Sequence, residues 1–308
     1  MIRVKRLKKN YGRFEALKSI SFEVREGSIF GFIGRNGAGK TTTMNILTGL
    51  IGFDGGDISI MGKDFVKNRQ GLISHIGYLP ETPAFYDYMN SYEYLSLMAA
   101  IAGHKTGDSK RRIQQLLEMV ALKKDAARKI GGYSRGMKQR LALAVAVLDR
   151  PSILFLDEPS SALDPEGRLE MMGLIDTLKH EKITIFLSTH ILNDAERVCD
   201  TISIIDEGKI LLTERLEELH RRHMHPIFDI EFEQEPEYES MSLKRLGWVD
   251  DVNIMGKKLS VRVNDMDRAK KEILRELIRS GNNIVSYQVR KMKLEDIFIG
   301  MVNRDAHI

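Results

Sequence analysis

The sequence predicts an α/β core that is interrupted by a helical subdomain and followed by a smaller α+β domain. Three observations support this prediction. Short apolar runs of strand length lie on both sides of a glycine-rich loop and recur from residue 153 onward. Between residues 90 and 148, apolar residues recur at the spacing of a helix instead. Beyond residue 220, strand and helix patterns follow one another in a second, shorter series.

The first part of the core, residues 1 to about 30, is predicted to be rich in β-strands. Apolar and polar side chains alternate over Ile20–Val24 before a turn at Glu26-Gly27, which is typical of a half-buried strand. After the glycine-rich loop we expect a helix over Thr42–Leu50. Two further short strands are expected at Asp57–Met61 and Ile76–Leu79.

The helical subdomain is predicted at about residues 82–148, inside a first domain of residues 1–220. Three stretches place apolar side chains at i, i+3, i+4 and i+7, the pattern of one buried helix face. Because these stretches separate the strands of the core, we interpret them as an insertion. The residues at this spacing are Leu95, Met98, Ala99 and Ala102, then Ile113, Leu116, Leu117 and Val120, then Leu141, Ala144, Val145 and Leu148.

The core then resumes with the strands Ile153–Leu156, Ile183–Leu187 and Ile202–Ile205. The first two are continuous apolar runs, as expected of strands covered on both faces. A second domain is assigned to residues 221–308, and its βαββαβ order predicts a ferredoxin-like fold. Its expected elements are strand Ile227–Phe232, helix Glu239–Leu246, strands Val249–Ile254 and Leu259–Val263, helix Asp267–Arg279 and strand Ile284–Val289.

Composition excludes several classes of protein. Of the 308 residues, 43% are apolar and 29% are charged, which is ordinary for a globular protein. No apolar run approaches the roughly 18–20 residues that cross a bilayer, and the N-terminus shows no apolar signal region. The lone Cys199 fits a reducing compartment, so we expect a cytoplasmic protein. A net charge of +4 without a long basic tract gives no reason to expect a nucleic-acid partner.

The glycine-rich loop carries the strongest functional signal. Its sequence is Gly34-Arg35-Asn36-Gly37-Ala38-Gly39-Lys40-Thr41, followed by Thr42, and it joins the apolar strand Ile29–Ile33 to the expected helix. In this context the pattern is a phosphate-binding loop, whose backbone N–H groups and helix N-terminus face the phosphates. Lys40 would reach the β- and γ-phosphates, and the Thr41 hydroxyl would ligate Mg²⁺. A chance match to a glycine-rich turn would not explain the flanking strand and helix.

Two acidic residues follow the strand Ile153–Leu156. Asp157 would hold Mg²⁺ at the carboxyl edge of the sheet, directly or through water, and Glu158 would accept a proton from an attacking water. Paired acids after a strand are often only a solvated turn. Here they follow a phosphate loop, which favours the functional interpretation.

Residues 1–220 resemble the ATP-binding subunit of an ABC transporter, which has a P-loop NTPase core with an inserted helical subdomain. The resemblance depends on several motifs that occur in the family's order. They are Tyr11, Gly34–Thr42, Tyr78–Glu81, Ser134–Arg140, Leu156–Pro159, Ser161–Asp164 and Ser188-Thr189-His190. The ending Leu294–Phe298 resembles the C-terminal extension of the export-type, ABC-2-like members.

The resemblance implies further site residues. Tyr11 would stack on adenine, and His190 would contact the γ-phosphate. Ser134 and Gly136 would contact the γ-phosphate bound on a second subunit, and Ser134 can cap a helix whose N–H groups face that anion. A histidine after a strand is more often structural, but the Ser-Thr-His context favours the catalytic role. Hydrolysis would then require two chains, most simply two identical ones, closed over two ATP molecules.

Two positions depart from the family pattern. Glu81 stands where glutamine is usual; it keeps oxygen ligands for Mg²⁺ but adds negative charge. Arg135 and Met137 replace the second glycine and the glutamine of the usual signature segment. Both departures are familiar from export-type members that work with a separate membrane subunit, while Lys40, Asp157, Glu158 and His190 are intact.

These features predict an ATP-hydrolysing subunit that uses ATP and Mg²⁺, with Lys40, Glu158 and His190 as catalytic residues. It would bind a membrane permease at the inner face of the membrane and power export. The alternative is an ABC-type ATPase acting on a non-membrane partner such as the ribosome or DNA, but such proteins usually carry two nucleotide domains or a long coiled-coil insert. A P-loop GTPase or nucleotide kinase would leave the signature segment unexplained. A catalytically inactive subunit would not need Glu158 and His190.

Overall fold

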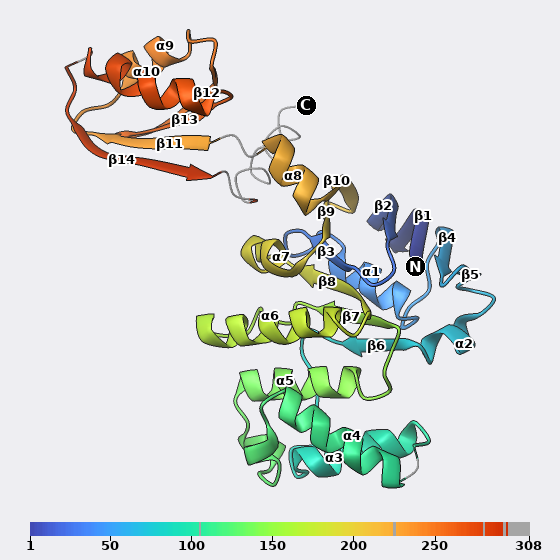
Figure 1. Cartoon of the computed structure of the whole chain (residues 1–308). Helices are drawn as coiled ribbons and strands as arrows, with labels where there is room; N and C mark the ends of the chain where they lie inside the picture. The colour runs from blue at the N-terminus through green and yellow to red at the C-terminus, as the bar shows by residue number, and fades with distance from the viewer. Residues whose placement is uncertain (105, 224–225, 280, 292–293, 295–308) are drawn as a thin grey trace. The chain divides into compact units, whose positions relative to one another are not determined.

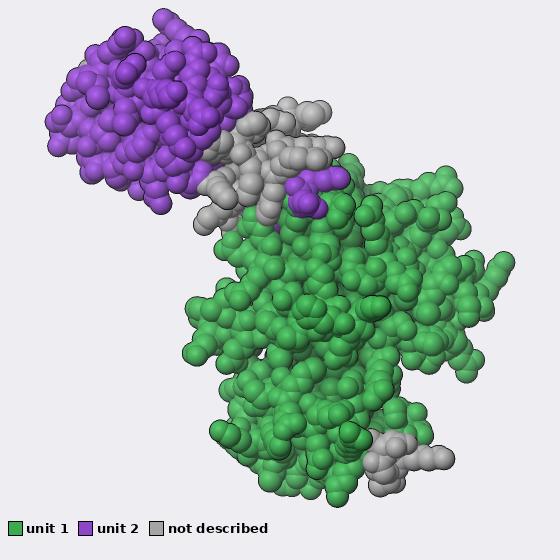
Figure 2. Space-filling model, in the orientation of Figure 1, with its two compact units in different colours: residues 1–216 green, residues 217–308 purple. Residues whose placement is uncertain are grey.

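The computed structural model describes residues 1–104, 106–223, 226–279, 281–291 and 294. The chain divides into two compact units, Met1–Leu216 and Glu217–Ile308, which Figure 2 distinguishes by colour. The sequence analysis predicts a boundary between residues 220 and 221, and the division in the structure falls between Leu216 and Glu217. It lies within α8 (Leu216–His223), which directly follows β10 (Lys209–Arg215).

The central sheet of the first unit positions the site. Its strand order is β10-β9-β3-β8-β7-β6, in which β10 is antiparallel to β9 and the other neighbours are parallel. Every residue of β3, β7 and β8 is buried, as predicted for strands covered on both faces. The register pairs Ile33 with Thr189 and Asp157 with Ser188, so the carboxyl ends of these strands meet at one edge. The strands are β3 (Ile29–Ile33), β6 (Ile76–Leu79), β7 (Ile153–Asp157), β8 (Thr184–Thr189) and β9 (Thr201–Asp206).

An antiparallel sheet packs on the central one. Its order is β2-β1-β4-β5, from β1 (Ile2–Tyr11), β2 (Phe14–Val24), β4 (Gly55–Ile60) and β5 (Lys63–Asp64). The two sheets share a core in which the Phe22 ring lies 5.5–5.7 Å from Phe30, Phe32 and Phe186. This aromatic contact fixes the β1–β2 hairpin, and with it Tyr11, beside the central sheet.

Helices α3 (Ser91–Ile101), α4 (Thr106–Met119) and α5 (Arg135–Ala146) form the inserted helical region, at the end of the first unit drawn lowest in Figure 1. The predicted apolar stripe of α4 is confirmed: all four of its residues are buried. For α3 the prediction is wrong at Ala102, which is exposed because the helix ends at Ile101. The remaining helices of the first unit are α1 (Lys40–Leu47), α2 (Arg69–Ile73), α6 (Pro165–Lys179) and α7 (Leu192–Val198). Short 3₁₀ segments lie at Lys123–Asp125 and Ile130–Gly132.

The second unit confirms the predicted βαββαβ order and the ferredoxin-like fold. Its sheet order is β12-β13-β11-β14 with antiparallel neighbours, and the core contains Phe228, Val261 and Ile273. Its predicted helix over Glu239–Leu246 begins earlier and ends at Leu243, where a turn leads into Gly247. The elements are β11 (Pro226–Phe232), α9 (Glu237–Leu243), β12 (Val249–Met255), β13 (Lys258–Val263), α10 (Met266–Ile278) and β14 (Ile284–Lys291). Of the predicted ending Leu294–Phe298, residues 295–298 lie outside the described residues.

Candidate nucleotide site

The loop between β3 and α1 is shaped for a phosphate. Gly37 (φ 84°) and Gly39 (φ 110°) adopt left-handed backbone conformations, and a Cβ added at Gly39 would lie 2.7 Å from a Leu17 methyl carbon. Helix α1 begins at Lys40 with no capping side chain and no acidic residue in its first turn. Its N-terminal N–H groups therefore remain available to an anion, which supports the fit of this loop to the phosphates of a nucleotide.

Lys40 is held in place by the loop itself. Its ammonium group donates hydrogen bonds to the carbonyl oxygens of Gly34 at 2.8 Å and Arg35 at 3.2 Å. It also lies 3.0 Å from Oε1 of Glu158, and both side chains are buried. The Lys40 ammonium group is therefore held by the backbone of the loop on one side and by the Glu158 carboxylate on the other. Of the other predicted binding residues, Asn36, Gly37 and Thr41 are exposed, Thr42 is half-buried and Ala38 is buried.

Asp157 ends β7 with one oxygen satisfied and one free. The Ser188 hydroxyl donates to Oδ1, whereas Oδ2 is buried and has no hydrogen-bond partner among the described residues. Burial raises the pKa of Asp157, and the hydroxyls of Ser188 and Thr41 oppose that rise. A buried carboxylate oxygen without a partner, next to a threonine hydroxyl, has the hard oxygen chemistry that Mg²⁺ prefers. The residues present therefore fit a magnesium ion.

Glu158 adopts an unusual backbone conformation for a residue with a side chain. Its φ is 48°, in the left-handed region, and its N–H donates to the Ser188 backbone oxygen at 3.2 Å and to the Ser188 hydroxyl at 3.1 Å. Such strain is often found at functional sites, where the surrounding structure enforces it. Here the conformation places the carboxylate between Lys40 and His190.

His190 lies on the opposite side of the Glu158 carboxylate from Lys40. Its ring Nδ1 lies 2.8 Å from Oε2 of Glu158, and its backbone N–H donates to the same oxygen at 3.3 Å. Oε1 faces Lys40 as an ion pair but makes no hydrogen bond within the described part of the chain, so it can still accept one. The three predicted catalytic residues, Lys40, Glu158 and His190, therefore meet at one point.

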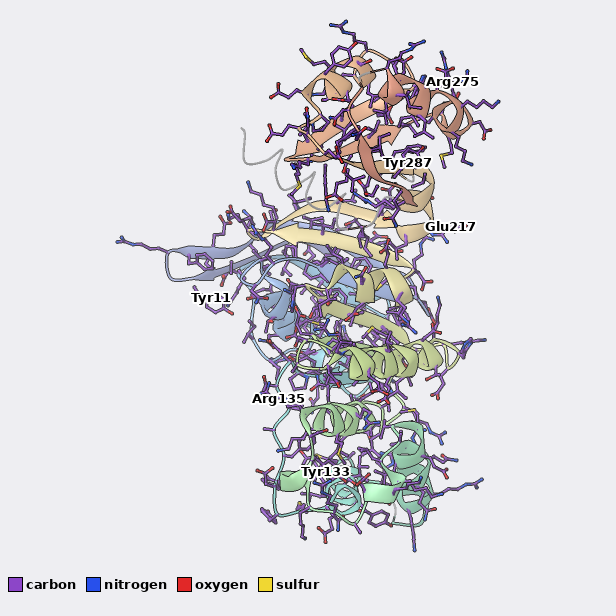
Figure 3. All side chains as sticks on the ribbon, turned by 90° about the vertical axis from the view of Figure 1, so that its left-hand side faces the viewer. Tyr11, Tyr133, Arg135, Glu217, Arg275 and Tyr287 are labelled. Carbon is purple, nitrogen blue, oxygen red and sulfur yellow. The ribbon has the colours of Figure 1, made fainter. Side chains whose placement is uncertain are left out.

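The structure places two other predicted residues at the edges of this region. Tyr11 lies near the outer end of the β1–β2 hairpin (Figure 3), 49% exposed, with the Lys9 ammonium 5.3 Å from its ring centre. Glu81 is exposed just beyond β6, the neighbour of β7. Burial and the charges of Asp157 and Glu81 raise the pKa of Tyr78 to about 12, so both acids act on this phenol. Tyr11 and Glu81 are thus open to a ligand, and their roles remain predictions.

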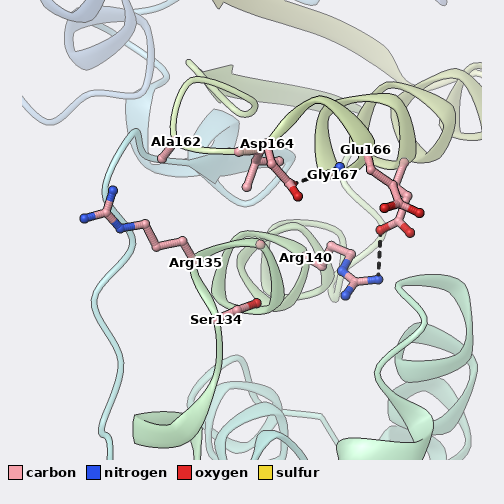
Figure 4. Close-up of a pocket in the computed structure, with 10 residues that line it drawn as sticks. Ser134, Arg135, Arg140, Ala162, Asp164, Glu166 and Gly167 are labelled. Carbon is pink, nitrogen blue, oxygen red and sulfur yellow. Dashed lines mark hydrogen bonds and ion pairs between the residues drawn. The ribbon is translucent and has the colours of Figure 1, made fainter.

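Ser134 and Gly136 lie on a separate cavity of about 350 Å³ between the start of α5 and the start of α6 (Figure 4). Ser134 caps α5 by accepting a hydrogen bond from the Met137 N–H at 3.2 Å, which confirms the predicted cap. Asp164 caps α6 on the facing side, and Arg140 pairs with Glu170 at 3.2 Å. The exposed Arg135 side chain extends away from Asp164 (Figure 4). Within one chain, Lys40 does not line this cavity.

Sequence reasoning missed the part played by Ser188. Its hydroxyl donates to Asp157 and accepts from the Glu158 N–H, so it orients both acids. Ser188 lies in the motif Ser188-Thr189-His190, which the sequence analysis recognises, but that analysis assigns a role to the histidine alone. A second buried pair, Ser160 with Asp194, joins the segment after Glu158 to the helix after His190.

Comparisons with known proteins agree with this geometry. The model of the ABC transporter family matches residues 17–161, and that of the C-terminal domain of DrrA1-3-like ATP-binding proteins matches residues 215–302. The chain is 36% identical to the uncharacterized ABC transporter ATP-binding protein YxlF of Bacillus subtilis, over 98% of this chain and 100% of that protein. It is 35% identical to the bacitracin transport ATP-binding protein BcrA of Bacillus licheniformis, over 98% and 97%.

The chain belongs to the ABC transporter ATP-binding proteins. Solved structures agree. One of an ATP-binding subunit of an ABC transporter is 32% identical, with a TM-score of 0.65 over 72% of this chain and 92% of that one. A dimeric cassette in a post-hydrolysis state with ADP and Pi is 25% identical, with a TM-score of 0.64 over 70% and 99%. This ABC protein is therefore an ATP-binding ATPase subunit with a P-loop NTPase core, and it carries an export-type C-terminal extension. Among its described residues no helix is both long and apolar enough to span a bilayer.

Proposed function

We propose that this ABC subunit powers export through a separate membrane permease, with two copies closing over two ATP molecules. The observation that carries the proposal is the position of the Glu158 carboxylate between Lys40 Nζ at 3.0 Å and His190 Nδ1 at 2.8 Å. Phosphoryl transfer requires a cation for the phosphate, an acceptor for the proton of water and a group that contacts the γ-phosphate. These three residue types converge beside the phosphate loop.

In the proposed reaction, Glu158 accepts the proton of the attacking water. Its Oε1, buried and without a hydrogen bond among the described residues, is suited to this task. Lys40 and His190 exchange their contacts with Glu158 for contacts with the γ-phosphate when ATP binds. Thr41 and Asp157 would hold Mg²⁺, with Glu81 nearby, and the ion would neutralise charge on the phosphates. Tyr11 would stack on the adenine.

Dimer formation is proposed from the position of the signature segment. Ser134 and Gly136 line a cavity that Lys40 does not line, which supports a role for them toward ATP held by another subunit. The start of α5 lines that cavity, and the N-terminal end of a helix favours an anion. ATP would then join two chains because it binds the closed pair more tightly than the open one. Two identical chains are the simplest arrangement.

The permease would dock on the segment Tyr78–Tyr88 and the helical region beside it. Tyr86 and Tyr88 are 51% and 71% exposed, and their rings stack 5.7 Å apart. Exposed paired aromatic rings are common anchors of protein interfaces. Relatives of similar length are described as bacitracin transport and linearmycin resistance ATP-binding proteins, which supports export as the process. The proposed location is the inner face of the cell membrane.

The test is purification of the tagged subunit from membranes, with identification of the integral protein that accompanies it. We expect a permease whose association weakens when both Tyr86 and Tyr88 become alanine. The matched control replaces Tyr238, another exposed tyrosine, in the C-terminal unit. Recovery with ribosomes or DNA, and not with a membrane protein, would support the alternative of a non-membrane ABC ATPase and refute this proposal.

A further inference from the structure

A second cavity of about 580 Å³ lies in the helical region, away from the nucleotide site. Its wall contains Arg111, Arg112 and Gln115 from α4, and Arg150 from the connection between α5 and β7. Figure 1 shows α4 beside α5 in this part of the molecule. None of these side chains belongs to the phosphate loop, the acidic strand or the signature segment. The cavity therefore gathers three cations without a role in the ATPase site.

Few negative charges oppose these arginines. Asp149 is the carboxylate in the described wall of the cavity, and it is already held by His104, with Nε2 to Oδ1 at 2.6 Å. The charge of Glu181 acts to raise the pKa of Arg112, but the two described side chains form no ion pair. Glu181 lines a neighbouring cavity together with Arg150. Arg111 and Arg150 make no side-chain hydrogen bond or ion pair with any described residue. The wall is therefore positive.

Arg112 distinguishes this cavity from an ordinary solvated basic surface. Its Nη2 donates to the Val147 carbonyl at 2.8 Å, but its Nε is buried and has no hydrogen-bond partner among the described residues. Burial and the neighbouring charge of Arg150 both lower the pKa of Arg112. An unpaired donor on a partly buried cation costs free energy unless a ligand satisfies it. The group is thus held where an anion would stabilise it.

The backbone also holds Arg150 at the cavity. Its φ is 50°, in the left-handed region that residues with a side chain seldom adopt, and it precedes Pro151. Its N–H donates to the Val147 carbonyl at 3.2 Å, which is also the acceptor for Arg112. One carbonyl therefore ties both arginines to the end of α5. The backbone of Arg150 and the guanidinium group of Arg112 therefore both begin from this point of the fold.

We propose that this cavity binds a phosphate-bearing anion, at a site separate from the nucleotide. Guanidinium groups bind phosphate oxygens through paired, charge-assisted hydrogen bonds, and Gln115 offers a neutral donor next to them. The volume lies within the usual range of roughly 300–1,000 Å³ for small-ligand sites. The same chemistry is presented by a free phosphorylated metabolite and by an anionic lipid headgroup, so the experiment includes both sources.

The experiment measures the dissociation constant of inorganic phosphate by calorimetry at low ionic strength, with Lys40→Ala in every protein to weaken binding at the phosphate loop. We expect Arg111→Gln with Arg150→Gln to weaken binding by about ten-fold or more, as for the loss of hydrogen bonds to a charged group. The matched control is Arg275→Gln, an exposed arginine of the C-terminal unit, which should change nothing. With Lys40 restored, the arginine variants should hydrolyse ATP normally, which shows that they fold.

Two results would overturn the proposal. One is that the Lys40→Ala protein does not bind phosphate, and the other is that adding Arg111→Gln and Arg150→Gln leaves its affinity for phosphate unchanged. Flotation with phosphatidylcholine vesicles, with and without phosphatidylglycerol, then identifies the source of the phosphate. If the double arginine variant loses binding to the anionic vesicles, the ligand is a lipid headgroup. If the double variant loses binding to inorganic phosphate but still binds the anionic vesicles, the ligand is a free phosphorylated compound.

Discussion

His190 and Glu158 are joined through their side chains, with Nδ1 2.8 Å from Oε2. An ionised carboxylate only accepts hydrogen bonds, so the imidazole would donate through Nδ1 to the ionised form of Glu158. Glu158 also faces Lys40 at 3.0 Å, and its side chain is only 5% exposed. The carboxylate therefore lies between the two side chains that the proposed reaction brings to the γ-phosphate. In the proposed reaction, nucleotide binding exchanges these partners, which would link occupancy of the site to the contacts of the Glu158 carboxylate.

The first prediction concerns the proton acceptor. Glu158→Gln should keep ATP binding but lose about 10²–10⁴-fold in turnover, because an amide cannot act as a general base. Steady-state hydrolysis and a nucleotide-binding assay check this. The matched control, Glu26→Gln, removes an exposed glutamate and should leave turnover unchanged. Near-normal hydrolysis by Glu158→Gln would remove this residue from the role.

The same substitution tests the dimer. Glu158→Gln should accumulate as a pair of chains when Mg²⁺ and ATP are added, because the nucleotide that joins them is no longer cleaved. Size-exclusion chromatography with light scattering measures the mass. Adding Lys40→Ala to this variant should restore the monomer, since the ammonium that holds the phosphates is lost. A monomer in both proteins would argue against closure over ATP.

His190 is expected to act on the γ-phosphate and not only on Glu158. His190→Ala should slow hydrolysis by about 10²–10³-fold, the usual cost of removing one hydrogen-bond donor from a developing charge. The measurement is the turnover number at saturating ATP. His180→Ala, which removes an exposed histidine at the end of α6, is the control. Equal rates in the two variants would leave His190 with a structural role only.

The fold of the core was predictable because its signals are local. The apolar runs that became β3, β7 and β8 are continuous, and the α4 stripe repeats at helical spacing. Helix α6 was not predicted, although Asp164 at its N-cap and Pro165 at its first position are helix start signals. The sequence analysis assigns Asp164 only to a family motif and gives Pro165 no role. Strand β10 was not predicted either.

The site was predictable in its residue types but not in its contacts. Lys40, Asp157 and Glu158 lie in recognisable segments, so spacing alone suggests their chemistry. The bond from Ser188 to Asp157 depends on the parallel register of β7 and β8, which joins residues 31 positions apart. The left-handed conformation of Glu158 has no sequence signal either, because glycine would be the usual residue there. Such features arise from tertiary structure.

Glu93 provides a pH-dependent prediction for the helical region. It forms a capping box with Asn90 at the start of α3, accepting from the Asn90 N–H at 2.8 Å while its own N–H donates to Asn90 Oδ1 at 2.9 Å. The Asn90 N–H, and to a lesser degree Lys129, hold the pKa of Glu93 below its ordinary value. The stabilisation is therefore present above the unfolded pKa of about 4.3 and lost as pH falls through the lower folded value.

Urea unfolding at a series of pH values checks this prediction. Glu93→Ala should be less stable than the parent protein at pH 7, and the difference should shrink as the pH falls through the folded pKa of Glu93. Glu26→Ala, at an exposed position, controls for the loss of one negative charge. A difference that stays constant down to pH 3 would show that the charged carboxylate does not stabilise α3.

The last prediction separates the two units. A fragment of residues 1–223, which keeps α8 whole, should bind ATP with the affinity of the full chain, because Tyr11 and Gly34–Thr42 lie in the first unit. The C-terminal unit has its own core around Phe228 and Ile273, so its removal does not open the core of the ATPase unit. Fluorescent-nucleotide titration measures the affinity, and circular dichroism shows whether the fragment is folded. A folded fragment that fails to bind ATP would assign part of the nucleotide site to the C-terminal unit.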